Sequence, residues 1–167
     1  MRALGIDPSS QATGYGIIES DGSAYAVLAY GTIKPGRSKD LPARLLEIKT
    51  GIERLISGFA PSEVAVENPF FSRNVRTAIT LGQVRGAVLV AVAGSGLPLA
   101  EYSALEIKKA VTGYGQAEKG QVGLMIRALL GIDDEAMEED AADALACAFC
   151  HVNTRQSLAN LERLKIG

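Results

Sequence analysis

The chain begins with an apolar run, Arg2-Ala-Leu-Gly-Ile-Asp7, and a Pro8-Ser9-Ser10 turn separates it from a second run, Thr13-Gly-Tyr-Gly-Ile-Ile-Glu-Ser20. Short apolar runs between turn signals are typical of strands. A Ser20-Asp-Gly22 turn follows, and a third strand is predicted over residues 23–33. Because the connections are so short, these three strands favour an antiparallel meander.

Helical and strand patterns alternate after this meander. Beyond a loop at residues 34–39, apolar residues recur every three or four positions from Asp40 to a break at 58–61, which predicts a helix. Val64-Ala-Val66 predicts a short buried strand that ends at Glu67. The remaining predicted elements are a helix near 73–93, a strand near 97–102, and helices near 103–111, 117–130 and 137–155. This order predicts a single α/β domain, residues 1–167, with a five-stranded mixed sheet flanked by helices.

The length and composition exclude several classes of protein. The 167 residues suit one domain and are too few for the two-lobed actin-like ATPases and sugar kinases. A mean hydropathy of +0.14 excludes a disordered chain. The longest nearly uncharged apolar stretch, residues 86–99, is shorter than the roughly 20 residues that cross a membrane. Because the apolar strand pattern starts at once, we expect no signal peptide, no membrane contact and a cytoplasmic location.

The charge of the chain is unevenly distributed. The net charge is −2 and the pI is near 5.5, which by themselves argue against a nucleic-acid partner. However, seven of the 19 acidic residues lie between Asp133 and Asp143, where no basic residue occurs. The rest of the chain therefore carries net positive charge and remains compatible with a nucleic-acid surface.

The sequence Cys147-Ala-Phe-Cys150-His151 matches the pattern of c-type haem attachment. It lies in an alanine-rich helical run, where Asp143, Cys147 and Cys150 fall on one stripe. Structural zinc sites usually use four nitrogen or sulfur ligands, and His151 is the only histidine. We therefore expect a buried helix face with reduced thiols, and no haem.

Four carboxylates stand out by their position in the predicted fold. Asp7 and Glu67 each end a strand, and Asp140 and Asp143 lie three residues apart on one face near the start of the last helix. Either strand-end residue alone could simply be the first solvated position. If a crossover helix makes the two strands parallel neighbours, Asp7 and Glu67 meet at one sheet edge. Converging carboxylates suit a hard cation such as Mg²⁺ or Mn²⁺, and two such ions can hydrolyse a phosphodiester.

Six short motifs follow one another along the chain: Gly5-Ile-Asp-Pro8, Thr13-Gly-Tyr-Gly16, Val66-Glu67, Leu81-Gly-Gln-x-Arg-Gly86, Gly113-x-Gly-x-Ala-x-Lys119 and Asp140-Ala-Ala-Asp143-Ala-Leu145. Over residues 2–155 this ordered set resembles the RuvC family, the bacterial Holliday junction resolvases. None of the motifs is specific alone, whereas the ordered set is very hard to obtain by chance. Ser9 departs from the pattern, because the family usually has glycine there, and a turn that needs positive φ would be strained.

The resemblance implies an RNase H-like fold and a homodimer that cuts opposed strands of a four-way DNA junction symmetrically. It implies that the four carboxylates are catalytic and bind Mg²⁺, with Mn²⁺ as a substitute and two ions per site. By motif, Phe70 would stack on an unpaired base at the crossover. Lys108 and Lys119 would meet DNA phosphate near the scissile bond. The family also implies cooperation with the RuvA–RuvB branch-migration complex.

Several other residues could contribute to a nucleic-acid surface. The Pro-Phe-Phe loop around Phe70 is a plausible place for exposed aromatic surface, on which a base can stack. Lys119 follows Gly113-Tyr-Gly-Gln at a helix start, a combination suited to phosphate. Three arginines on or beside the long helix could meet backbone phosphates, although each could be an ordinary solvated charge: Arg73, Arg76 and Arg85.

Gly82 and Gly86, four residues apart, permit close packing of the same helix. The element that packs there is either the sheet, which we favour, or the same helix of a two-fold partner.

Two alternatives to a junction resolvase remain open at this point. A related nuclease that processes pre-ribosomal RNA shares the Gly-Ile-Asp start and an acidic C-terminal motif, but the Pro-Phe-Phe loop and Lys108 favour the resolvase. The other alternative is a junction-binding module without catalysis. Asp140 and Asp143 argue against it, because a pure binder gains nothing from anions that face phosphate.

Overall fold

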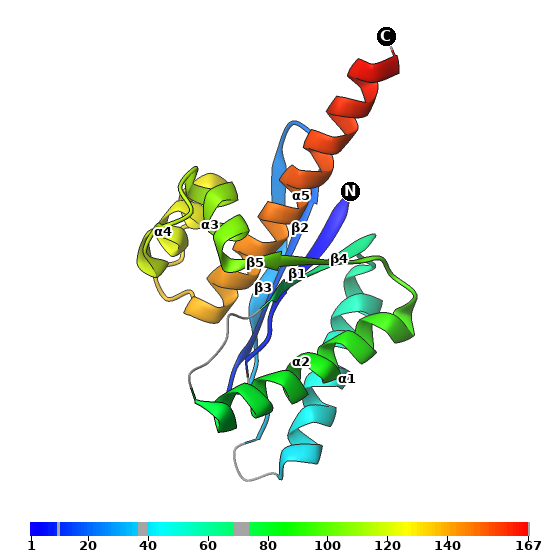
Figure 1. The fold of residues 1–167 in the computed structure, drawn as a ribbon, viewed down its shortest axis with the longest axis vertical. Coiled ribbons are helices and arrows are strands. Elements are labelled where there is room, and N and C mark those ends of the chain that lie inside the picture. The colour runs from blue at the N-terminus through cyan, green and yellow to red at the C-terminus, as the bar shows by residue number, and fades with distance from the viewer. Residues whose placement is uncertain (10, 37–39, 69–73, 167) are drawn as a thin grey trace.

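The computed structural model describes residues 1–9, 11–36, 40–68 and 74–166. Five strands and five helices lie within these ranges (Figure 1). They are β1 (Arg2–Asp7), β2 (Thr13–Ser20), β3 (Tyr25–Ile33), α1 (Leu41–Phe59), β4 (Glu63–Asn68), α2 (Val75–Ser95), β5 (Leu99–Ser103), α3 (Ala104–Thr112), α4 (Lys119–Leu130) and α5 (Glu139–Ile166).

The strands form one mixed sheet in the order β3-β2-β1-β4-β5. The first three strands are antiparallel neighbours, so the predicted meander is confirmed. β4 pairs with β1 in parallel, and β5 pairs with β4 in parallel. The crossover through α1 therefore returns β4 alongside β1, as the placement of Asp7 and Glu67 at one edge required.

Helices cover both faces of the sheet (Figure 1). On one face α1 and α2 enclose a core around Leu4, Ile6 and Val66, while on the other α3, α4 and α5 enclose a core around Ala3, Ile18 and Ala65. Each face therefore buries its own apolar layer, and alternate residues of β1 and β4 point to opposite layers. The predicted five-stranded α/β architecture is confirmed.

α5 packs with its backbone directly on β2. A Cβ built on Gly14 would lie 1.9 Å from the carbonyl oxygen of Asp140, and one built on Gly16 would lie 2.7 Å from the side chain of Leu145. No other residue type fits these positions without moving the helix. The glycines of the Thr-Gly-Tyr-Gly motif therefore fix how closely the start of α5 approaches the sheet.

The last helix is longer than predicted from the sequence. It continues to Ile166 instead of ending near residue 155, and its final turns extend beyond the sheet (Figure 1). The segment after Asn153 contains neither Gly nor Pro until Gly167, so nothing in it breaks the helix. Cys147 and Cys150 of the predicted stripe are buried, as is His151, which confirms the predicted buried helix face.

α2 is long and apolar enough, by length and composition alone, to cross a membrane. In this fold it lies on the sheet instead, through four buried residues: Val84, Val88, Ala91 and Val92. It begins at Val75 rather than residue 73, because the side chain of Asn74 caps it by accepting from the backbone N–H of Thr77. The prediction that Gly82 and Gly86 pack closely against the sheet is wrong, because no described atom lies within 4 Å of a Cβ built on either residue.

Candidate active site

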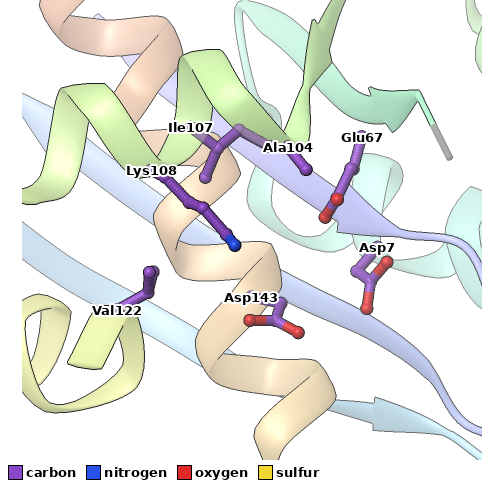
Figure 2. Close-up of a pocket in the computed structure, with 7 residues that line it drawn as sticks. All are labelled: Asp7, Glu67, Ala104, Ile107, Lys108, Val122 and Asp143. Atoms are coloured by element: carbon purple, nitrogen blue, oxygen red, sulfur yellow. The ribbon is translucent and has the colours of Figure 1, made fainter. Parts of the chain in front are cut away.

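A cavity of about 310 Å³ opens at the ends of β1 and β4. Three of the predicted carboxylates line it, together with one lysine: Asp7, Glu67, Asp143 and Lys108 (Figure 2). Figure 2 shows the three carboxylates and the lysine side chain directed toward the same space. Residues far apart in the sequence are thus brought together as a group of acids with one base, at the edge where α/β sheets place their sites.

The sheet register explains why Asp7 and Glu67 meet. Asp7 is the last residue of β1, and Ile6 pairs with Val66 of the parallel strand β4. Glu67 follows Val66 directly, so the two carboxylates leave neighbouring strands at the same height. The predicted meeting of Asp7 and Glu67 at one sheet edge is confirmed.

The other two predicted carboxylates, Asp140 and Asp143, lie on the first two turns of α5. Asp143 lines the cavity, whereas Asp140 is not among the described residues that line it. The backbone of Asp140 lies over Gly14, which is the register partner of Asp7. Asp140 therefore lies over β2, next to Asp7, and only three of the four predicted carboxylates share the cavity.

Lys108 comes from α3, which starts directly after β5. A capping box fixes this start: Ser103 N–H donates to Glu106 Oε2 at 2.8 Å, and Glu106 N–H donates to Ser103 Oγ at 3.3 Å. The Ser103 hydroxyl also donates to Glu106 Oε2 at 2.6 Å, and this hydrogen bond, followed by that from the Ser103 backbone N–H, lowers the pKa of Glu106. Lys108 lies one turn further on, so its position depends on a rigid β5–α3 junction.

The thiol of Cys147 lies buried beneath these carboxylates. Burial is the main reason that its pKa is raised well above the ordinary value, and the negative charges of Glu67 and Asp7 raise it further. Burial also raises the pKa of the Cys150 thiol to about 11. Both cysteines are therefore neutral at physiological pH, and neither lines the cavity within the described part of the chain.

The ligand chemistry of the cavity fits a hard cation. Its three carboxylates offer oxygen ligands only, which Mg²⁺ and Mn²⁺ prefer over nitrogen and sulfur ligands. As the side chains stand, no three described His, Cys, Asp or Glu residues form a ready-made cage. An ion that joined these carboxylates would offset their mutual repulsion and draw them together.

The structure describes three of the five predicted DNA-binding residues, and one of them lines this cavity. Lys108 lines it, Arg76 is exposed on the first turn of α2, and Lys119 is the first residue of α4. Phe70 and Arg73 lie outside the described residues. Arg85 forms an ion pair with Glu101 of β5 at 2.6 Å, so it is engaged within the fold.

Two features near the site were not predicted from the sequence. The Thr13 hydroxyl donates to the backbone carbonyl of Ser9 at 2.8 Å and so holds the turn after Asp7. Apart from glycines, Ala60 alone has positive φ among the described residues, so Ser9 is not strained. The second feature is a pair of polar side chains on the edge strand β3, Tyr30 and Thr32, which hydrogen-bond to the segment before α5. The alternation of polar and apolar residues in this strand could have indicated it.

Comparisons with known proteins agree on one family. The family model for crossover junction endodeoxyribonuclease RuvC matches residues 3–151. The protein of that name from Magnetococcus marinus is 49% identical, over 93% of this chain and 86% of its own length. The one from Syntrophomonas wolfei is 43% identical, over 97% of this chain and 94% of its own.

Solved structures agree as well. Thermus thermophilus RuvC in complex with a Holliday junction substrate matches with a TM-score of 0.88 and 32% identity, over 94% of this chain and 96% of that one. A yeast mitochondrial Holliday junction resolvase matches with a TM-score of 0.65 and 12% identity, over 89% of this chain and 76% of that one, and thus shares the fold. The predicted RNase H-like fold is confirmed.

Proposed function

Because the chain belongs to the RuvC family of crossover junction endodeoxyribonucleases, we propose that four carboxylates carry its metal-dependent cleavage of Holliday junctions: Asp7, Glu67, Asp140 and Asp143. The protein is a nuclease of recombination and repair that acts on four-way DNA junctions. Relatives with high coverage carry the name of a DNA endonuclease, so the pre-ribosomal RNA alternative and the binding module without catalysis are both set aside.

The observation that carries the proposal is the convergence of Asp7, Glu67 and Asp143 with Lys108 in one cavity. The carboxylates would hold Mg²⁺, or Mn²⁺ in its place, with two ions per site, and the bound metal would supply Lewis-acid stabilisation and an activated water for in-line displacement. The carboxylates hold and orient this charge. The positive end of the α5 dipole, near Asp140 and Asp143, helps to keep both residues ionised.

Lys108 has a distinct role in this proposal. Its ammonium group shares the cavity with three anions, so it can donate to a phosphate oxygen that enters between them. There it would compensate the negative charge that builds up on the phosphate during hydrolysis. The lysine and the acids thus act on the same phosphate from different sides.

The proposal includes four further DNA contacts. Arg76 and Lys119 would bind backbone phosphates, and Arg73 would extend that contact. Phe70 would stack on an unpaired base at the crossover. The proposal also includes cooperation with the RuvA–RuvB complex and a cytoplasmic location, where bacterial DNA lies.

An exposed face of α2 supports the homodimer, which is also part of the proposal. Five residues repeat at spacings of four and three on the side opposite the buried one: Val75, Ile79, Gly82, Gly86 and Val90. The three aliphatic side chains are 73%, 59% and 60% exposed, and the two glycines meet no described atom. A second copy of α2 fits such a face, because the glycines allow close approach of two helices. A two-fold dimer would also supply one cavity for each of the two opposed DNA strands of a junction.

The test is cleavage of a mobile four-way DNA junction, with the nicks mapped on each strand. Paired nicks on opposed strands are expected with Mg²⁺ and none with EDTA. Asp143→Asn should lower the rate by about 10²-fold or more, because it removes one charged group from the cavity. Glu139→Gln, which removes the same charge four residues earlier on α5, is the matched control. Wild-type cleavage by Asp143→Asn would contradict the proposal.

A further inference from the structure

We propose that a row of three polar residues at the end of the edge strand β3 and directly after it, Tyr30, Thr32 and Lys34, positions the carboxylates of α5 and thereby sets the metal affinity of the site. These three residues touch neither metal nor DNA in this proposal. They hold the segment that leads into α5, and so act through Asp140 and Asp143. The inference rests on the proposed metal-binding role of those two residues.

The row holds the α4–α5 connection at two points. The Tyr30 hydroxyl donates to Asp134 Oδ2 at 2.9 Å. The Thr32 hydroxyl donates to Glu138 Oε1 at 3.0 Å, and Lys34 forms an ion pair with the other carboxylate oxygen of Glu138. Alternate residues of a strand point to the same face, which places Tyr30 and Thr32 on the side where α5 lies.

The two acidic residues held by the row, Asp134 and Glu138, both lie in the segment that leads into α5. Glu138 directly precedes α5, and its carbonyl accepts from the backbone N–H groups of Ala141 and Ala142 in the first turn, each at 3.1 Å. The Asp134 carbonyl accepts from Arg127 Nη1 at 3.1 Å, which ties the same segment to the end of α4. A change at Thr32 or Lys34 is therefore transmitted directly to the first turn of α5.

The sheet register places this anchor beside the metal site. Asp7 pairs with Gly14, and Gly14 pairs with Thr32, so the three residues form one row across β1, β2 and β3. The backbone of Asp140 lies on Gly14, in the middle of that row. Gly14 thus supports the helix start from below, while the Thr32–Glu138 hydrogen bond holds it from the side away from Asp7. Without that hydrogen bond the helix start can shift sideways, which changes the separation of Asp7 from the carboxylates of α5.

The exposure of the row indicates that its contribution is positional. The side chains of Lys34 and Glu138 are 59% and 45% exposed, and ion pairs this exposed contribute little to stability. Residues that orient metal ligands, in contrast, typically change metal affinity by about 10- to 100-fold when they are removed. The row should therefore affect the metal requirement of the enzyme far more than its melting temperature.

The experiment measures Mg²⁺ binding to the full chain by isothermal titration calorimetry without DNA, and junction cleavage as a function of Mg²⁺ concentration, for wild type and for Thr32→Val combined with Lys34→Met. The Mg²⁺ concentration at half-maximal rate should rise by about 10-fold or more, with most of the rate recovered at saturating Mg²⁺. Lys34→Met combined with Thr32→Ser, which keeps a hydroxyl, should restore part of the affinity. An unchanged Mg²⁺ requirement would overturn the inference.

Two controls separate this result from other causes. Lys49→Met removes an exposed ion pair with Glu53 on α1, and it should leave the Mg²⁺ requirement unchanged. Tyr30→Phe removes only the hydroxyl that donates to Asp134 and keeps the ring in the core, so it should raise the Mg²⁺ requirement without loss of packing, and a requirement equal to that of wild type would exclude Tyr30 from the row. Failure of the proposed function is recognised separately, because Asp143→Asn would then cleave like wild type whatever the variants of the row do.

Discussion

The Tyr102 hydroxyl lies 2.9 Å from Nδ1 of His151, in the core between β5 and α5. The other ring nitrogen of His151, Nε2, lies 3.2 Å from Glu63 Oε2, and Arg155 also donates to that oxygen. The pattern suits a neutral ring that accepts from the phenol at Nδ1 and donates from Nε2. His151, the third member of the Cys-x-x-Cys-His pattern, is therefore a hydrogen-bonded core residue.

This burial predicts a pH dependence of stability. Burial lowers the pKa of His151 below its ordinary 6.5, although the charge of Glu63 opposes the shift. As the pH falls through about 6.5, the unfolded chain therefore binds a proton before the folded protein does, and the free energy of unfolding decreases. The contribution of His151 is fully present above that pH and is lost below it.

His151→Gln should remove this part of the pH dependence. Between about pH 7.5 and 5.5 the melting temperature of the wild type should fall more steeply than that of the variant, because glutamine does not titrate. The measurement is thermal unfolding of both proteins across this range. Parallel curves would show that His151 does not titrate differently in the folded and unfolded states.

Gly5→Ala should destabilise the protein by about 1–3 kcal/mol or more, because overpacking strains a close contact. A Cβ at this position would lie 2.1 Å from the carbonyl oxygen of Ala144, and a helix backbone cannot move aside as a side chain can. Gly58→Ala on α1 is the matched control, since no described atom lies within 4 Å of its Cβ. Gly58→Ala should stabilise the protein by about 0.4–1 kcal/mol. Denaturant unfolding measures the change in the free energy of unfolding for both variants.

Lys108→Met should lower the cleavage rate at saturating Mg²⁺ by about 10²-fold, because it removes the positive charge that is proposed to face the phosphate. Its matched control is Lys109→Met, which removes an exposed lysine one residue further along α3. Single-turnover cleavage of a junction separates this loss from weaker DNA binding. Equal rates for the two variants would exclude a special role for Lys108.

Ile79→Asp should weaken the proposed dimer, because it places a charge in the centre of the α2 face. Ile79 is 59% exposed, and Leu46 on α1 is 61% exposed, so Leu46→Asp is a control of equal exposure outside that face. Sedimentation velocity at several concentrations measures the association. Equal association of the two variants would place the dimer contact elsewhere.

The local patterns of the sequence were sufficient for the elements and for part of the site. Strand and helix periodicities depend on neighbouring residues, so all five strands and the main helices were predicted, with ends displaced by a few residues. The position of Asp7 and Glu67 at strand ends was equally local. Their meeting additionally required β1 and β4 to be parallel neighbours, which the structure confirms.

Contacts between distant segments depended on the tertiary structure alone. No sequence pattern places Asp140 over Gly14 and leaves it off the cavity that Asp143 lines, because this depends on how closely α5 approaches the sheet. The hydrogen bond between Thr32 and Glu138 likewise joins residues 106 positions apart. The sequence by itself therefore determined which side chains were available for catalysis, and the packing of α5 on the glycines of β1 and β2 determined which of them share the cavity.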